Sequence, residues 1–206
     1  MPEFRKLLEG YRRFLKDEYS RERERWDSLA EGQEPPVMIV ACCDSRVDPA
    51  TIFSTIPGQA FVLRNVANLV PPYETGGGLH GASAAIEFGV TGLQVRHVVV
   101  MGHGACGGIK AALTDRHDCD QHSFVQNWMA ILDDCRAEVI ADVSLQDKQI
   151  ALEYAAVRQS LANLRTFPFV AEREAAGELS LHGCHFSIFH GELFLLDEAD
   201  GQFHAA

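Results

Sequence analysis

The chain has 206 residues, of which 47% are hydrophobic and 23% are charged, and its formal net charge is −11. This length most simply forms one domain with a sizeable core, and the composition is typical of a soluble globular protein. The excess of acidic residues argues against general binding to nucleic acids or to anionic membranes. The apolar runs are only strand-length, which argues against a transmembrane helix.

The six cysteines are spaced too irregularly for a disulfide scaffold in a chain of this length. The first residues lead into a charged helix instead of the apolar core of a signal peptide. We therefore expect a cytoplasmic, reducing location, in which Cys119, Cys135 and Cys184 are free thiols.

Residues 3–28 are predicted to form an amphipathic helix. Its apolar side chains recur at helical spacing: Phe4, Leu7, Leu8, Tyr11, Phe14 and Leu15. The pattern leaves open whether this helix packs on its own domain or lies as an arm on a second subunit. We interpret residues 1–206 as a single domain with a helical arm at 1–30, and a loop at 31–36 leads into the first strand.

Beyond that loop, strand and helix patterns alternate. Strands are predicted at 37–41, 60–64, 97–102, 179–188 and 192–197, and helices at 82–90, 106–114, 122–140 and 146–165. This alternation predicts an α/β fold with a mainly parallel sheet flanked by helices. The last strand is apolar enough to be buried or to pair across subunits.

Two short motifs follow two of the predicted strands. Cys42-Cys43-Asp44-Ser45-Arg46 comes after the first strand, and His103-Gly104-Ala105-Cys106-Gly107-Gly108 comes after the strand at 97–102. Because the carboxyl ends of parallel strands meet at one edge of a sheet, we expect the two motifs to lie side by side. Two cysteines and one histidine form a zinc ligand set that leaves one position open for water.

The second motif spans a strand end and a helix start. Its spacing lets the strand present the His103 imidazole while the helix start presents the Cys106 thiol. The positive end of the helix dipole favours the thiolate form of Cys106. Gly107 and Gly108 allow the backbone to approach whatever occupies the site.

In the first motif, alternate residues of an extended segment share a side. Cys42, Asp44 and Arg46 can therefore face one cavity, while Cys43 is predicted to point away and pack. Arg46 can hold Asp44 as a carboxylate through a bidentate pair, although a surface ion pair of little energetic value is the alternative. Two thiolates neutralise zinc formally, so bound water should be less acidic than at a three-histidine site. We therefore expect any reaction that uses this water to become faster as the pH rises above neutral.

The motifs C-x-D-S-R and H-x-x-C-G resemble those of the β-class carbonic anhydrases, in particular the plant-like branch. The similarity continues through residues 61–73, 160–164, 167–170 and 181–183. It implies one Zn²⁺ per subunit, bound by Cys42, His103 and Cys106. The implied reaction is the reversible hydration of CO2 to bicarbonate and a proton, by attack of zinc-bound hydroxide.

The resemblance also implies roles for the neighbouring side chains. Asp44 would orient the hydroxide, or become a fourth zinc ligand in a closed, inactive state, and Arg46 would hold Asp44 away from the metal. The predicted substrate pocket consists of Gln33, Phe61, Val66, Phe88 and Gly107. Composition alone would place the apolar members of that set in the core.

Two positions depart from patterns seen in the family. Phe88 stands where the plant-like branch has a Tyr, so a hydroxyl that can hydrogen-bond a ligand sulfur is missing. Ile39 stands where another branch has the Trp of a regulatory bicarbonate site, so we expect no such site here.

The resemblance further implies an intimate homodimer or a higher even-numbered oligomer. Its catalytic clefts would lie at the subunit interface, with the N-terminal helix on the neighbour and the C-terminal strands at the interface. Hydrolysis of carbonyl sulfide or carbon disulfide on the same scaffold is the alternative activity. A permanently closed structural zinc module and a thiol redox protein are the other rivals, and the vicinal Cys42-Cys43 pair is poorly suited to a disulfide.

Overall fold

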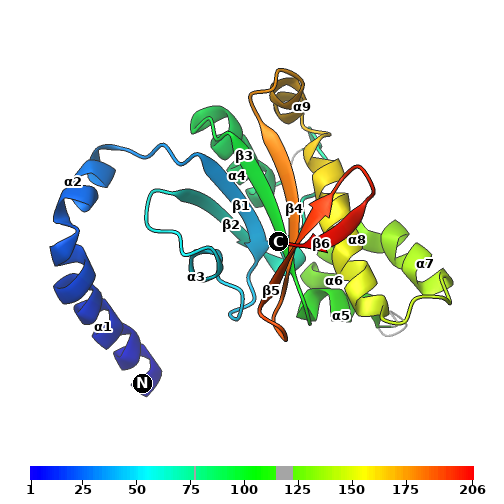
Figure 1. Cartoon of the computed structure of the whole chain (residues 1–206), viewed down its shortest axis with the longest axis horizontal. Helices are drawn as coiled ribbons and strands as arrows, with labels where there is room; N and C mark the ends of the chain where they lie inside the picture. The colour runs from blue at the N-terminus through cyan, green and yellow to red at the C-terminus, as the bar shows by residue number, and fades with distance from the viewer. Residues whose placement is uncertain (77, 115–122) are drawn as a thin grey trace. The chain divides into compact units, whose positions relative to one another are not determined.

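The computed structural model describes residues 1–76, 78–114 and 123–206, which contacts divide into two compact units, Met1–Glu34 and Pro35–Ala206 (Figure 1). The N-terminal unit contains α1 (Pro2–Phe14), a π-helical turn (Leu15–Tyr19) and α2 (Arg23–Glu31). The predicted helix at 3–28 is therefore helical but not continuous. Phe14, Tyr19 and Trp26 pack together at the bend, with the rings of Phe14 and Trp26 5.5 Å apart.

The second unit is built on a six-stranded sheet with the strand order β2-β1-β3-β4-β5-β6. Its strands are β1 (Val37–Cys42), β2 (Ala60–Asn65), β3 (His97–His103), β4 (Ser180–Ser187), β5 (Glu192–Asp197) and β6 (Gln202–Ala205). The first four strands in that order are parallel and the last two pair antiparallel. The predicted mainly parallel sheet is confirmed, and β6 is a strand that the sequence did not indicate.

Helices flank this sheet, as predicted. They are α3 (Pro49–Ile52), α4 (Gly81–Glu87), α5 (Gly107–Leu113), α6 (Phe124–Met129), α7 (Asp133–Ala141), α8 (Lys148–Leu164) and α9 (Pro168–Ala175). Shorter turns lie at Val66–Asn68, Phe88–Gly92 and Ala130–Leu132. The helix predicted at 122–140 is thus divided into pieces, its first residue lies outside the described residues, and α3 and α9 were not predicted.

Successive side chains of β1 point to opposite faces of the sheet and pack into two different core clusters. Met38 and Val40 belong to one cluster, whereas Ile39 and Ala41 belong to the other. The long helix α8 crosses β3 and β4 very closely at Val157. A Cβ atom at Gly102 or Gly183 would lie 2.7 or 2.9 Å from a Val157 methyl, so only glycine allows this approach.

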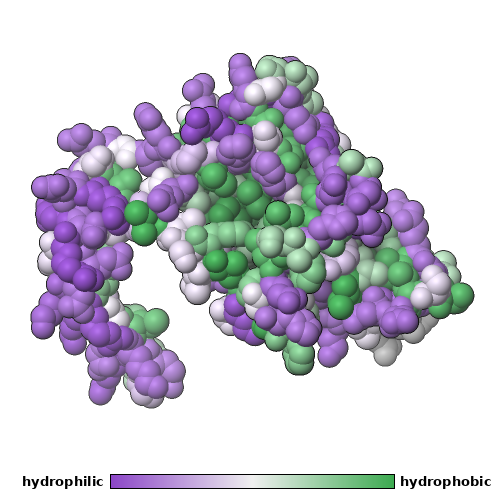
Figure 2. Space-filling model, in the orientation of Figure 1, coloured by the Kyte–Doolittle hydropathy of each residue, from purple (hydrophilic) through white to green (hydrophobic). Residues whose placement is uncertain are grey.

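Within the second unit, part of the sheet is left uncovered by the other described elements (Figure 2). Figure 2 shows apolar side chains gathered over its central strands. An apolar hollow of about 350 Å³ lies there, with Val37, Ile39, Val99, Leu193 and Leu195 among its lining residues. Among the described residues, no helix is both long enough and apolar enough to span a bilayer.

Candidate metal centre

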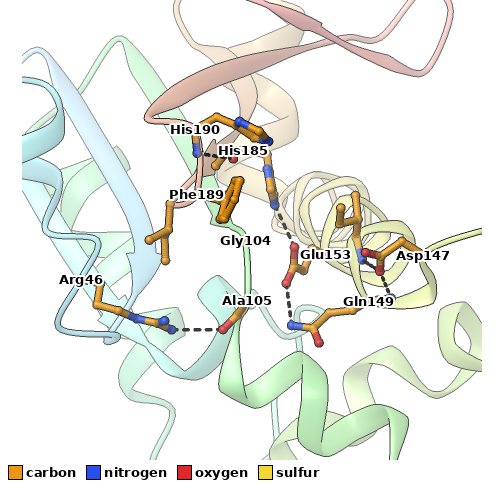
Figure 3. A pocket seen from close by; sticks show the side chains of 12 residues that line it. Arg46, Gly104, Ala105, Asp147, Gln149, Glu153, His185, Phe189 and His190 are labelled. Atoms are coloured by element: carbon orange, nitrogen blue, oxygen red, sulfur yellow. Dashed lines mark hydrogen bonds and ion pairs between the residues drawn. The ribbon is translucent and has the colours of Figure 1, made fainter.

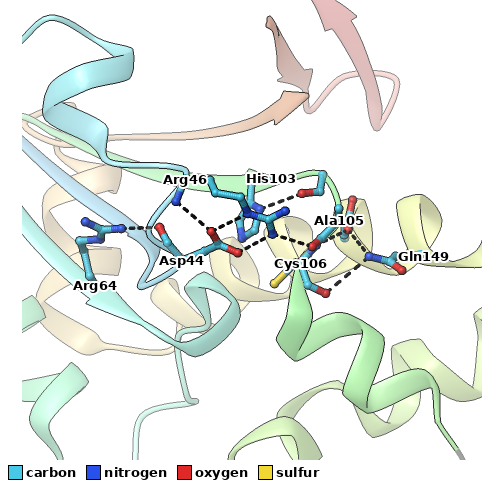
Figure 4. Close-up of polar contacts among 9 residues, drawn as sticks. Asp44, Arg46, Arg64, His103, Ala105, Cys106 and Gln149 are labelled. Carbon is cyan, nitrogen blue, oxygen red and sulfur yellow. Dashed lines mark hydrogen bonds and ion pairs between the residues drawn. The ribbon is translucent and has the colours of Figure 1, made fainter. Parts of the chain in front are cut away.

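The two motifs leave the sheet at the same edge. β1 ends at Cys42, β3 ends at His103, and the two strands pair in parallel with Ala41 opposite Met101. Cys106 caps the start of α5. The structure brings the three predicted ligands together, because the two sulfurs and a ring nitrogen of His103 all lie within 4.8 Å of one another (Figure 4).

The imidazole of His103 is oriented by its own loop. Its Nδ1 atom lies 2.9 Å from the carbonyl oxygen of Gly104, and the whole residue is 1% exposed. Its Nε2 atom is buried and has no hydrogen-bond partner of normal geometry among the described residues. A buried polar atom of this kind is costly unless a ligand satisfies it, and a metal ion would do so.

The two buried thiols lie close together and shift each other's pKa in opposite directions. The pKa of Cys42 falls to about 4 because Cys106 donates a hydrogen bond to its sulfur, and the nearby His103 lowers it further while burial opposes the shift. The pKa of Cys106 rises because of its contact with the Cys42 sulfur and because it is buried, although the backbone N–H groups of Ile109 and Gly108 favour its thiolate. A divalent cation held by both sulfurs would supply the counter-charge that two adjacent thiolates need, so the donor set fits Zn²⁺.

The predicted Asp44–Arg46 pair is bidentate. Arg46 donates from Nε to Asp44 Oδ1 at 2.9 Å and from Nη2 to Oδ2 at 2.7 Å, and its backbone N–H donates to Oδ1 at 2.9 Å. These bonds hold the pKa of Asp44 well below its usual range. Asp44 is therefore a fixed carboxylate whose remaining lone pairs can accept hydrogen bonds.

Arg64 fixes the backbone of the first motif, a role that the sequence analysis did not identify. Its guanidinium donates to the carbonyl oxygens of Cys42 and Asp44 at 3.0 and 2.7 Å, and to Asp48 Oδ2 at 2.8 Å. The pairing of β1 with β2 explains this role. It places Arg64 opposite Ala41, and so puts a cation beside the end of β1.

Glu153 was not identified from the sequence as a residue of this centre either. It is 2% exposed on α8, and its Oε1 accepts a hydrogen bond from the backbone N–H of Cys106 at 3.0 Å. Its signal in the sequence is a single acid among the apolar residues of a helical face, beside Leu152 and Ala156.

The predicted pocket residues fall in different places. Val66 packs against the core cluster that contains Cys42 and Cys106, and a Cβ atom at Gly107 would meet nothing within 4 Å. Phe61 instead packs against the Met38 cluster, with its ring 5.8 Å from that of Phe88, which is 52% exposed. Gln33 is exposed in the N-terminal unit.

All the cysteines that the structure describes are free thiols, and Cys119 lies outside the described residues. The prediction that Cys43 is packed was wrong, because its side chain is exposed. The Cys43 N–H donates to the carbonyl oxygen of Asn65 and so continues the pairing of β1 with β2, but the described residues do not bury the Cys43 side chain.

Comparison with known proteins places this centre in a family. The sequence profile described as carbonic anhydrase matches residues 37–193. Beta carbonic anhydrase 3 of Arabidopsis thaliana is 35% identical over 199 residues, covering 93% of this chain and 77% of that protein.

Solved structures agree with the sequence comparison. The β-carbonic anhydrase CcaA is 31% identical and superimposes with a TM-score of 0.93 over 100% of this chain and 93% of its own. A tetrameric β-carbonic anhydrase from Sordaria macrospora is 28% identical, with a TM-score of 0.82 over 95% of this chain and 98% of its own. The chain therefore belongs to the carbonic anhydrase family, in its β class.

Proposed function

We propose that this protein catalyses the reversible hydration of CO2 to bicarbonate and a proton at one Zn²⁺ per subunit, held by Cys42, His103 and Cys106. The observation that carries the proposal is the buried group of two sulfurs and an unpartnered ring nitrogen beside a fixed carboxylate. Membership of the β class supports CO2 as the substrate. When bound, Zn²⁺ supplies the Lewis acidity that makes water a nucleophile near neutral pH.

The chain's own residues orient the reacting water. Asp44 accepts a hydrogen bond from that water and so directs its lone pair towards CO2. Arg46 donates hydrogen bonds to both carboxylate oxygens of Asp44. These bonds favour the open state, in which Asp44 is away from the metal, over the closed state in which Asp44 is a ligand. Val66 supplies an apolar wall next to the ligands, and Gly107 leaves room for the substrate.

A second copy of the chain completes the pocket in this proposal. Phe61 and Phe88 pack with each other away from the ligands of their own chain, and Phe88 is half-exposed. A homodimer or a higher even-numbered oligomer brings that pair, and Gln33, to the partner's cleft. The apolar hollow over the sheet and the exposed apolar side chains of α1 support such an interface, and the Sordaria macrospora relatives are described as tetrameric.

Stopped-flow CO2 hydration by the zinc-loaded protein from about pH 6.5 to 9 tests the proposal. We expect a rate that rises with pH and falls at least ~100-fold in Asp44→Ala. Asp142→Ala, which removes an exposed acid that is hydrogen-bonded to Ser144 outside the metal centre, is the matched control and should keep the wild-type rate.

A flat pH profile, or an Asp44→Ala variant as fast as the wild type, would contradict the mechanism. If CO2 is not hydrated while carbonyl sulfide is hydrolysed, the substrate assignment fails and the alternative activity takes its place. A cytoplasmic location and a single-domain organisation remain our predictions.

A further inference from the structure

The peptide group between Ala105 and Cys106 is held at both ends by charged side chains. Its carbonyl oxygen accepts a hydrogen bond from Arg46 Nη2 at 3.1 Å, and its N–H donates to Glu153 Oε1 at 3.0 Å. Figure 4 shows the Arg46 contact, and Figure 3 shows Arg46 and Glu153 approaching the loop from opposite sides of one cavity. A cation at the oxygen and an anion at the N–H match the dipole of the peptide group and fix its orientation.

Glu153 is itself rigidly supported. Its Oε1 also accepts a hydrogen bond from Gln149 Nε2 at 3.1 Å, and its Oε2 lies 3.0 Å from His185 Nε2. Both Glu153 and His185 are at least 97% buried. A buried carboxylate is expensive unless its oxygens are hydrogen-bonded, and these three contacts meet that requirement.

The orientation of this peptide matters because it lies between two metal ligands. Ala105 has a φ of 55°, in the left-handed region that alanine rarely adopts, so the loop does not hold this shape by local preference. Rotation of the Ala105–Cys106 peptide would turn the backbone that carries Cys106 and would remove the carbonyl oxygen to which Arg46 donates. Arg46 in turn holds both oxygens of Asp44.

We infer that Glu153 is a positioning residue that acts through the Ala105–Cys106 peptide on both the Cys106 ligand and the Asp44–Arg46 pair. It never contacts substrate. It sets how tightly the centre binds its metal and how firmly Arg46 is anchored. The inference rests on the proposed metal site.

The first test is the Zn²⁺ dissociation constant of the full-length protein, measured by competition with a chromophoric chelator. Glu153→Met fills the same space without an acceptor, and we expect it to weaken Zn²⁺ binding ~10–100-fold, as loss of a residue supporting a ligand commonly does. Glu153→Gln keeps an oxygen for the Cys106 N–H and should recover most of that loss. Should Glu153→Met not fold, Glu153→Asp replaces it, because its shorter side chain withdraws the acceptor from Cys106.

Asn163→Leu is the matched control. Asn163 lies on the same helix as Glu153 and is 6% exposed. Its side chain donates at 2.8 Å to the backbone oxygen of Val70, which is not part of the metal centre. It should lower the melting temperature without changing the Zn²⁺ dissociation constant. The visible absorption spectrum of the Co²⁺-loaded protein, which reports thiolate geometry, should change in Glu153→Met and stay as in the wild type in Asn163→Leu.

A double-mutant cycle tests the connection to Arg46. Since Arg46 and Glu153 hold one peptide, Arg46→Met and Glu153→Met should be non-additive in their effects on Zn²⁺ binding. Additive losses would overturn the connection through the peptide. Equal Zn²⁺ affinity and an equal Co²⁺ spectrum in wild type and Glu153→Met would overturn the inference and leave the metal site standing, whereas a wild type that binds no Zn²⁺ would overturn both.

Discussion

Gly108 of α5 and Val66 lie so close together that a Cβ atom on Gly108 would sit 2.8 Å from Cγ1 of Val66. The same atom would lie 3.1 Å from the Cβ of Ala67. This approach lets α5 begin beside the segment that follows β2, and so brings Cys106 to Cys42. Its neighbour Gly107 has open space at the equivalent position.

Substitution of these adjacent glycines should therefore affect different properties of the protein. Gly108→Ala forces Val66 and Ala67 to move and should lower the free energy of unfolding by about 1–3 kcal/mol, with weaker Zn²⁺ binding. Gly107→Ala should leave stability within about 1 kcal/mol of the wild type, yet slow CO2 hydration by narrowing the predicted pocket. Urea unfolding and stopped-flow assays separate the two, and equal stability losses would contradict the packing argument.

Loading with metal should stabilise the folded protein. At free Zn²⁺ 100-fold above its dissociation constant, binding adds about 2.7 kcal/mol and raises the melting temperature. His103→Ala should abolish this shift because its ring nitrogen completes the ligand set. Cys135→Ser, which changes a free thiol outside the ligand group, should keep the shift in thermal melts of chelator-treated protein.

The buried thiol of Cys184 should make stability fall at alkaline pH. Burial raises its pKa from 9.0 to about 12 in the folded state. A raised pKa gives a contribution that is complete below the unfolded value and is lost as pH rises towards the folded value. The stability difference between wild type and Cys184→Ala should therefore shrink by about 1 kcal/mol between roughly pH 8 and 10 in urea unfolding. A constant difference would show that Cys184 ionises as freely in the fold as in the unfolded chain.

Arg165 should stabilise the protein at neutral pH and not in acid. It binds Glu174 and Glu198 with contacts of 2.8 to 3.2 Å, and its hydrogen bond lowers the pKa of Glu198. A lowered pKa gives stability that is present above the unfolded value and is lost as pH falls. Because the groups are partly exposed, Arg165→Gln should cost only about 1 kcal/mol at pH 7, and less near pH 3.5.

The control for that prediction is Arg23→Gln, which breaks an exposed pair with Asp27. Because both side chains are exposed to solvent, this variant should unfold at the same urea concentration as the wild type at both pH values. An Arg165→Gln variant whose loss is the same at both pH values would contradict the electrostatic origin of the effect.

The grouping of Cys42, His103 and Cys106 could be predicted because each motif follows a strand with a clear apolar run. Val37–Cys42 and His97–His103 are both buried strands, and parallel pairing leaves no other place for the residues that follow them. The bidentate geometry of Asp44 and Arg46 followed in the same way, from two residues on one side of a short segment.

Other features depend on contacts between distant segments and could not be predicted. Glu153 is separated from Cys106 by the whole of α6 and α7, and only tertiary packing brings its carboxylate to that N–H. β6 has four residues and pairs only because a turn returns it to β5. The exposure of Cys43 depends on whether another segment of the chain covers it, which strand periodicity does not determine.

The parallel pairing of β1 with β3 has a consequence for how the protein folds. His103 and Cys106 are near neighbours in the chain, but Cys42 reaches them only after β2 and α4 have crossed over and β3 has docked against β1. Closing the intervening chain costs conformational entropy, and an ion held only by the local pair does not offset that cost. We therefore expect the complete set of three donors to form only when β1 and β3 are paired.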